Sequence, residues 1–136
     1  MKRNSHLILF CLFLAGGILL SLAPIQVPDG VDKVYHFVGF ALVTTSAIST
    51  FISFFGKKYI DSFLIFLLAF GGVFAGMSEF AQKFVALRSC NVEDWITNLC
   101  GITLVVVISF LSLSKEKTKV ELNSGRFEFK DLPAAF

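Results

Sequence analysis

The chain has 136 residues, of which 55% are hydrophobic and only 16% are charged, and its formal net charge is +2. Soluble domains are about 45–50% apolar and about 25% charged, so this composition predicts a protein that lies in a membrane. A net charge this small argues against the extensive basic surface that nucleic-acid binding requires, and we expect no nucleic-acid partner.

The first apolar segment, residues 7–23, carries no charge and has nearly the length that a membrane-spanning helix requires. Lys2 and Arg3 precede it, which is also the pattern of a secretory signal. The apolar run is longer than the core of a usual signal, and Pro24 directly follows the small residues at which cleavage would occur. We therefore expect a retained helix, with a cleaved signal as the alternative.

Three further segments have the length and composition of spans: residues 34–55, 62–80 and 94–113. The links between them are short, which favours antiparallel neighbours. We therefore predict an all-α, four-helix transmembrane bundle with up-down topology over residues 1–113, followed by a short polar tail, 114–136.

Lysine and arginine are unevenly distributed about these spans. With the N-terminus inside the cell, nine basic residues lie at the inner face and three at the outer face, namely Lys33, Lys83 and Arg88. Because basic residues are enriched in cytoplasmic segments, both termini are expected to be cytoplasmic.

The tail has two short alternating stretches, residues 120–122 and 127–129, around the turn-forming residues 123–125. This pattern is typical of a small hairpin. An isolated hairpin is only marginally stable in water, so a disordered tail is the alternative.

Small residues are concentrated in two spans, as Ala15-Gly16-Gly17 in the first and as a GxxxG pair, Gly72 and Gly76, in the third. Such positions let helix backbones approach closely. Packing within the bundle is the simpler interpretation, and a homo- or hetero-oligomer formed through Gly72 and Gly76 is the other.

Polar residues gather where the predicted spans meet the outer face. Lys33 and His36 are three residues apart, as are Glu79 and Gln82, so each pair shares one helix face. Ionisable groups at membrane depth are costly and usually mark a function. We expect one shared ligand-binding pocket, formed by a polar set consisting of Lys33, His36, Glu79, Gln82, Arg88, Asp94 and Asn98.

Each of these residues also has a simpler structural interpretation. Asp94 follows Asn91 as in a helix cap, and Lys33 is placed to extend to the lipid headgroups. The other interpretations are a hydrogen-bonded interior histidine at His36, an ion pair between Glu79 and Arg88, an amide at Asn98 that satisfies a neighbouring helix, and an interfacial anchor at Trp95.

The polar residues occur in motifs that resemble those of the VanZ-like family. Residues 32–40, DKVYHFVGF, look like its DK-x-x-H-F-x-x-F motif, and residues 79–82, EFAQ, look like its E-x-x-Q. Arg88 and residues 94–101 look like its R…D-x-x-x-N-x-x-G. The chain departs from the family pattern at Ala86-Leu87, where Pro-Gly is common, and at Val105, where a second glycine is common.

This resemblance implies a protein of the bacterial cytoplasmic membrane, because the founding member of the family is associated with resistance to the glycopeptide teicoplanin. It supplies no biochemical activity. The polar set fits three roles: recognition of a membrane lipid or lipid-linked envelope precursor, with Lys33 and Arg88 on phosphate; acid–base catalysis on an envelope lipid by His36 and Glu79; or a structural subunit of an envelope complex.

No cofactor and no metal are expected. The sequence has no nucleotide-binding loop or haem motif, and Cys11, Cys90 and Cys100 match no metal or disulfide spacing. His36, Glu79 and Asp94 have side chains that can bind a metal, but one histidine with two carboxylates on separate helices is weak evidence for a metal site.

Overall fold

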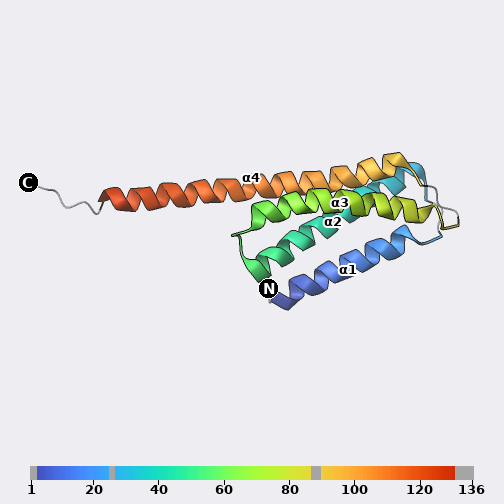
Figure 1. Ribbon diagram of the computed structural model, residues 1–136, viewed down its shortest axis with the longest axis horizontal. Coiled ribbons are helices and arrows are strands. Elements are labelled where there is room, and N and C mark those ends of the chain that lie inside the picture. Colours follow the sequence, from blue (N-terminus) through green and yellow to red (C-terminus); the bar gives the residue numbers. More distant parts are fainter. Residues whose placement is uncertain (1–2, 25–26, 87–89, 131–136) are drawn as a thin grey trace, which may run out of the picture. The chain divides into compact units, whose positions relative to one another are not determined.

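The computed structural model describes residues 3–24, 27–86 and 90–130, and every element of secondary structure within these ranges is a helix. The helices are α1 (Arg3–Ser21), α2 (Asp29–Phe55), α3 (Ile60–Gln82) and α4 (Val92–Lys130) (Figure 1). Each contains a stretch that is long and apolar enough to cross a membrane. The predicted all-helical class is confirmed, and the chain is a multi-pass membrane protein.

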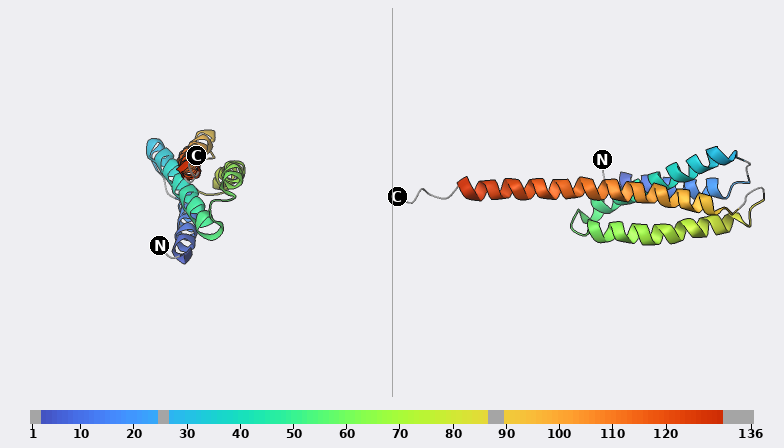
Figure 2. Two further views of the ribbon diagram at one scale, coloured as in Figure 1. Left: turned by 90° about the vertical axis from the view of Figure 1, so that its left-hand side faces the viewer. Right: turned by 90° about the horizontal axis from the view of Figure 1, so that it is seen from above.

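The chain divides into a bundle that ends at Val106 and a second part that begins at Val107. Within the bundle, α2 contacts both α1 and α3, and the first turns of α4 lie beside α2 and α3 (Figure 2). The described residues of the second part, 107–130, continue α4. The division after Val106 reflects packing, whereas the boundary predicted between residues 113 and 114 concerns the membrane and stays a prediction.

Helix α2 begins five residues before the predicted span. Its first turn is closed by the carbonyl of Pro28, which accepts the N–H groups of Val31 and Asp32 at 2.9 Å. A hydropathy count stops at charged residues, but a helix does not, so α2 includes Asp32 and places it one turn before His36. The helix ends at Gly56, whose φ of 70° is a conformation that glycine adopts without steric cost.

A single glycine sets the distance between α2 and α4. A Cβ added at Gly101 would lie 2.5 Å from the backbone oxygen of Phe37, closer than any real Cβ contact. Only glycine therefore permits this approach of the two backbones. The same approach brings together the side chains next to it in the two helices.

The predicted GxxxG pair packs against α4 of the same chain. A Cβ at Gly72 would lie 3.2 Å from Leu99, and one at Gly76 would lie 3.4 Å from the indole nitrogen of Trp95. That nitrogen donates a hydrogen bond to the carbonyl of Gly72 at 3.1 Å, so Trp95 has a packing role besides any role as an interfacial anchor. An oligomer through Gly72 and Gly76 stays a prediction.

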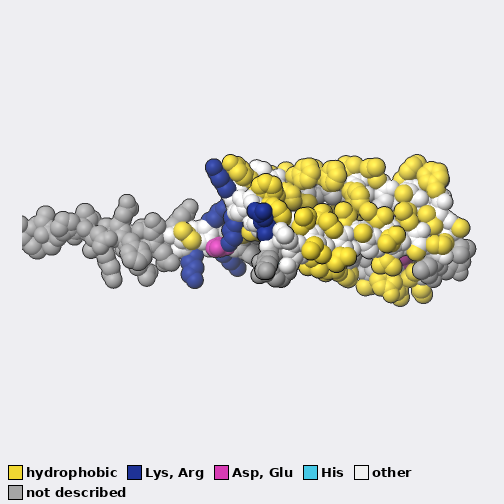
Figure 3. Space-filling view, turned by 90° about the horizontal axis from the view of Figure 1, so that it is seen from below, with side chains coloured by type: hydrophobic (Ala, Val, Ile, Leu, Met, Phe, Trp, Pro, Cys, Tyr) yellow, Lys and Arg dark blue, Asp and Glu magenta, His cyan; other side chains and the backbone are white. Residues whose placement is uncertain are grey.

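The surface of the bundle is apolar and its interior is mixed. Leu12, Leu19 and Ile65 are each more than 60% exposed, and apolar side chains cover the face of the bundle in Figure 3. The buried described residues include as many polar as apolar side chains. A soluble protein exposes mostly polar residues and buries mostly apolar ones. The apolar surface of this bundle therefore fits the lipid of a bilayer.

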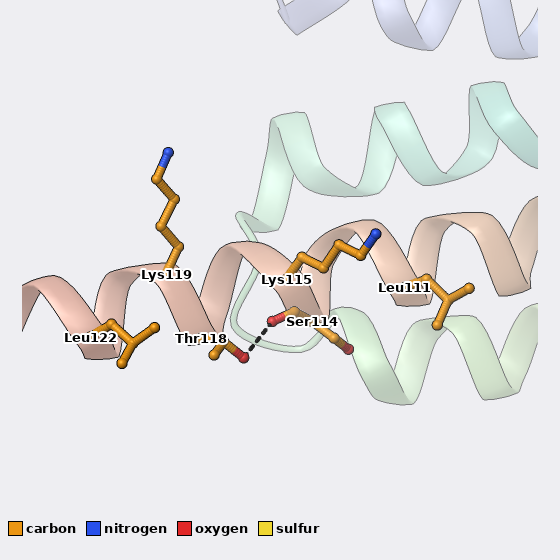
Figure 4. A pocket seen from close by; sticks show the side chains of 6 residues that line it. All are labelled: Leu111, Ser114, Lys115, Thr118, Lys119 and Leu122. Carbon is orange, nitrogen blue, oxygen red and sulfur yellow. Dashed lines mark hydrogen bonds between the residues drawn. The ribbon is translucent and has the colours of Figure 1, made fainter.

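The hairpin predicted in the tail is wrong, because α4 continues as a helix to Lys130. Extending an existing helix adds one hydrogen bond per residue. An isolated hairpin has no such nucleus to extend and is only marginally stable in water. Along this part the Thr118 hydroxyl donates to the carbonyl of Ser114 at 3.1 Å (Figure 4). The shallow depression between Leu111 and Leu122 is lined by one helix only and cannot enclose a ligand.

Candidate functional site

Five members of the predicted polar set lie at one end of the bundle, and all five are buried. They come from the start of α2, the end of α3 and the start of α4. The most exposed of them, His36, has only 7% of its surface accessible. We call this region the polar end and define it by those five residues and two others that the structure adds, Ser21 and Asp32: Ser21, Asp32, His36, Glu79, Gln82, Asp94 and Asn98.

A chain of hydrogen bonds joins three helices at the polar end. The Asn98 amide donates to Glu79 Oε1 at 3.0 Å, which turns its Oδ1 toward His36 Nδ1 at 3.1 Å. An amide oxygen can only accept, so Nδ1 is the protonated ring nitrogen. The same Nδ1 lies 3.3 Å from Glu79 Oε1. The predicted interior role of Asn98, satisfying a neighbouring helix, is therefore present in the structure.

Two buried polar atoms at this end have no hydrogen-bond partner among the described residues, His36 Nε2 and Glu79 Oε2. Buried polar atoms are almost always paired, because leaving one unpaired costs about 1–3 kcal/mol. Nε2 faces the carboxylate of Asp32, whose Oδ2 lies 3.8 Å away. That distance is too long for a hydrogen bond. Both atoms therefore keep an unused capacity for a hydrogen bond or a coordinate bond.

Helix α1 contributes a residue to the polar end, although the predicted polar set contains no residue of the first span. The amide of Gln82 donates to the hydroxyl of Ser21 at 2.8 Å. Ser21 is the last residue of α1, at the same level as the end of α3, although no residue of α1 is fully buried. Ser21 is a polar residue near the end of the otherwise apolar segment 7–23, and this position is the sequence signal that could have indicated its role.

Two acidic residues, Asp32 and Asp94, lie close to His36, and the cap of α4 is formed by Asn91. Asn91 caps α4, since its Oδ1 accepts the N–H of Glu93 at 3.0 Å. Asp94 is 5% exposed and is buried in the bundle. One ligand atom each of Asp32, His36 and Asp94 lies within 4.8 Å of the others. Asp32 is not a member of the predicted polar set, although it belongs to the motif at residues 32–40.

Of the two predicted phosphate-binding cations, the structure describes only Lys33. Lys33 pairs with the exposed carboxylate of Glu93, so this cation lies at the edge of the polar end. Arg88 lies outside the described residues, and so does the predicted ion pair between Glu79 and Arg88. Cys11, Cys90 and Cys100 are free and exposed.

Over 122 residues the chain is 30% identical to an uncharacterized protein of Schizosaccharomyces pombe, and the match covers 88% of this chain and 72% of that protein. The chain belongs to the same family as this fungal protein. No family model and no solved structure matches the chain. The fungal member carries no assigned activity, so the chemistry of the family has to be derived from the polar end itself.

The polar end is chemically an acceptor-rich site. Three carboxylates, those of Asp32, Glu79 and Asp94, surround the imidazole of His36. Carboxylates and an unprotonated ring nitrogen bind cations and hydrogen-bond donors. An anionic group would need additional positive charge here, from Lys33, from Arg88 or from a bound cation.

Proposed function

We propose that the chain is a VanZ-like integral membrane protein of the bacterial cell envelope that recognises a lipid headgroup through its polar end. The observation that supports this proposal is the buried network of His36, Asn98 and Glu79 at the end of an apolar bundle. Ionisable groups at membrane depth are rarely kept without a function. A headgroup is the polar ligand available at that depth.

The chemistry of the ligand follows from the side chains. A phosphate, on a membrane lipid or on a lipid-linked envelope precursor, would be held by Lys33 and Arg88. The fungal relative favours a ligand that bacteria and fungi share, a phospholipid or a polyprenyl phosphate, over a precursor unique to the bacterial wall. A change in teicoplanin susceptibility would then be an indirect effect.

The proposed topology is up-down, with both termini in the cytoplasm and the polar end at the outer leaflet of the bacterial cytoplasmic membrane. The excess of lysine and arginine on the terminal side supports it. So does the contact between Thr50, near the end of α2, and the carbonyl of His6, near the start of α1, at 3.0 Å. The ends of α1 and α3 also meet, at Ser21 and Gln82.

Lipid retention tests the proposal. Purified wild-type protein, Arg88→Ala and Lys83→Ala would be compared by native mass spectrometry after extraction in a mild detergent. Lys83 is exposed at the C-terminal end of α3 and lies outside the polar set, so Lys83→Ala controls for the loss of one positive charge. We expect wild type and Lys83→Ala to retain a phosphate-bearing lipid and Arg88→Ala to lose it. Equal retention by all three would reject the proposal.

An acid–base enzyme acting on an envelope lipid is the second candidate, because His36 Nδ1 and Glu79 Oε1 are 3.3 Å apart in one buried site. General acid–base catalysis requires two titratable groups within reach of one substrate. If His36→Ala and Glu79→Gln cells keep normal protein abundance but change their lipid profile, catalysis is favoured. Loss of protein abundance in both would instead favour a structural subunit.

A further inference from the structure

Asp32, His36 and Asp94 form a cluster with the composition of a metal site. Asp32 and His36 are four residues apart in α2 and so lie on the same face of the helix, and Asp94 reaches them from the first turn of α4. One oxygen or nitrogen of each lies within 4.8 Å of the others. His36 and Asp94 are both more than nine-tenths buried.

The imidazole of His36 is oriented for coordination. Its Nδ1–H is directed at Asn98 Oδ1, which leaves the lone pair on Nε2. Nε2 is buried, has no hydrogen-bond partner among the described residues, and faces Asp32 Oδ2 at 3.8 Å. Two ligand atoms that each bind one metal ion at about 2.0–2.2 Å lie roughly 3–4 Å apart. The separation is thus too long for a hydrogen bond and suitable for a shared cation.

The residues behind the imidazole support the same interpretation. A metal-binding histidine almost always donates its other ring N–H to a carboxylate or a carbonyl oxygen, which fixes the ring and raises its basicity. Asn98 Oδ1 takes this position, and the Asn98 amide is in turn held by Glu79 at 3.0 Å. The combination that the sequence indicated only weakly was His36, Glu79 and Asp94. In the structure Glu79 lies behind Asn98, and Asp32 lies beside His36 Nε2.

We propose that Asp32, His36 and Asp94 bind one divalent transition-metal cation, with Asn98 and Glu79 orienting the histidine. Imidazole is a ligand for zinc and its neighbours and is seldom used for calcium or magnesium. Three protein ligands are the number found in zinc sites that keep one position open.

The open position connects the cation to the proposed function. Bound metal would supply positive charge among the carboxylates of Asp32 and Asp94, and the open position would accept a phosphate oxygen of a headgroup. This step rests on the proposed recognition of a lipid headgroup. Binding of the cation itself does not, since it depends only on the three side chains.

Metal titration of the full chain tests the site. Chelator-treated protein in detergent, without added lipid, would be titrated with Zn²⁺ by calorimetry and with Co²⁺ by visible absorption. We expect one equivalent of each to bind, with Co²⁺ giving the ligand-field bands of a site containing nitrogen and oxygen ligands. Asp32→Asn and Asp94→Asn, which preserve side-chain shape, should weaken binding at least tenfold. Asn98→Ala should weaken it about 10- to 100-fold.

Glu93→Gln provides the matched control, because Glu93 is an exposed carboxylate that precedes Asp94 in the sequence and pairs with Lys33. It should bind the metal as the wild type does. Wild-type protein that binds no stoichiometric metal, or Asp32→Asn and Asp94→Asn variants with wild-type affinity, would overturn the proposal. If an asparagine variant does not fold, the wild-type Co²⁺ spectrum alone decides.

The two proposals fail separately in this design. Lipid retention that persists in metal-free protein, together with an absence of metal binding, would remove the cation site and leave headgroup recognition. Stoichiometric metal binding, together with equal lipid retention by wild type and Arg88→Ala, would remove headgroup recognition and leave the cation site.

Discussion

The backbone oxygen of Phe37 lies where a side chain at position 101 would begin, because a Cβ on Gly101 would come within 2.5 Å of it. Phe37 follows His36 in α2, and Gly101 lies one helical turn after Asn98 in α4. The close approach of these two backbones therefore also determines whether His36 and Asn98 can reach one another, at the observed 3.1 Å.

Replacing Gly101 with alanine should separate α2 from α4. Because the contact is with backbone, which cannot rotate aside, we expect a loss of about 1–3 kcal/mol in stability and a lower melting temperature in detergent. Gly39→Ala is the control, since a Cβ there meets nothing within 4 Å. A melting temperature of Gly101→Ala equal to that of Gly39→Ala would contradict the packing described for α2 and α4.

Asn98→Ala should disconnect the three helices at the polar end. It removes the donor to Glu79 and the acceptor for His36, and interhelical hydrogen bonds in membranes contribute about 0.6–2 kcal/mol each. We expect destabilisation of about that size, measured by thermal unfolding in detergent. Thr97→Ala alters a neighbouring side chain whose hydrogen bond among the described residues lies within α4, to the carbonyl of Glu93, and this variant should melt close to wild type. Equal melting of the two variants would show that the network does not hold the bundle together.

Ser21 and Gln82 should be energetically coupled. Their 2.8 Å hydrogen bond links α1 to α3 at the polar end. In a double-mutant cycle with Ser21→Ala and Gln82→Ala, the combined loss of stability should be smaller than the sum of the single losses by about 0.5–1 kcal/mol. Strict additivity would mean that α1 is held by its apolar contacts alone.

Cys90 reports on the orientation of the bundle. It is exposed in the link between α3 and α4, beside the polar end. In a chain carrying Cys11→Ser and Cys100→Ser, a membrane-impermeant thiol reagent should label Cys90 in intact cells. Asp61→Cys, in the exposed first turn of α3 at the opposite end and in a chain without the other cysteines, should be labelled only after permeabilisation. The inverse pattern would place the termini outside.

Sequence reasoning identified a membrane protein with four spans, because span length and hydropathy are local properties of the chain. It also selected His36, Glu79 and Asn98, because helical spacing shows which residues share a face. Its errors occurred where composition was used to locate helix ends. It began the second span at Val34, five residues after the start of α2, and it treated residues 120–129 as a hairpin or disordered although α4 continues through them.

What the sequence by itself determined is the class of protein and the residue types available at one end of its helices. Which side chains meet was decided by tertiary structure alone. Helix rotation and separation depend on contacts between distant segments, such as Gly101 with Phe37 and Gly76 with Trp95. Those contacts place Glu79 behind Asn98, Asp32 in front of His36, and Ser21 against Gln82. No spacing along one helix contains that information, because the distances are set between helices.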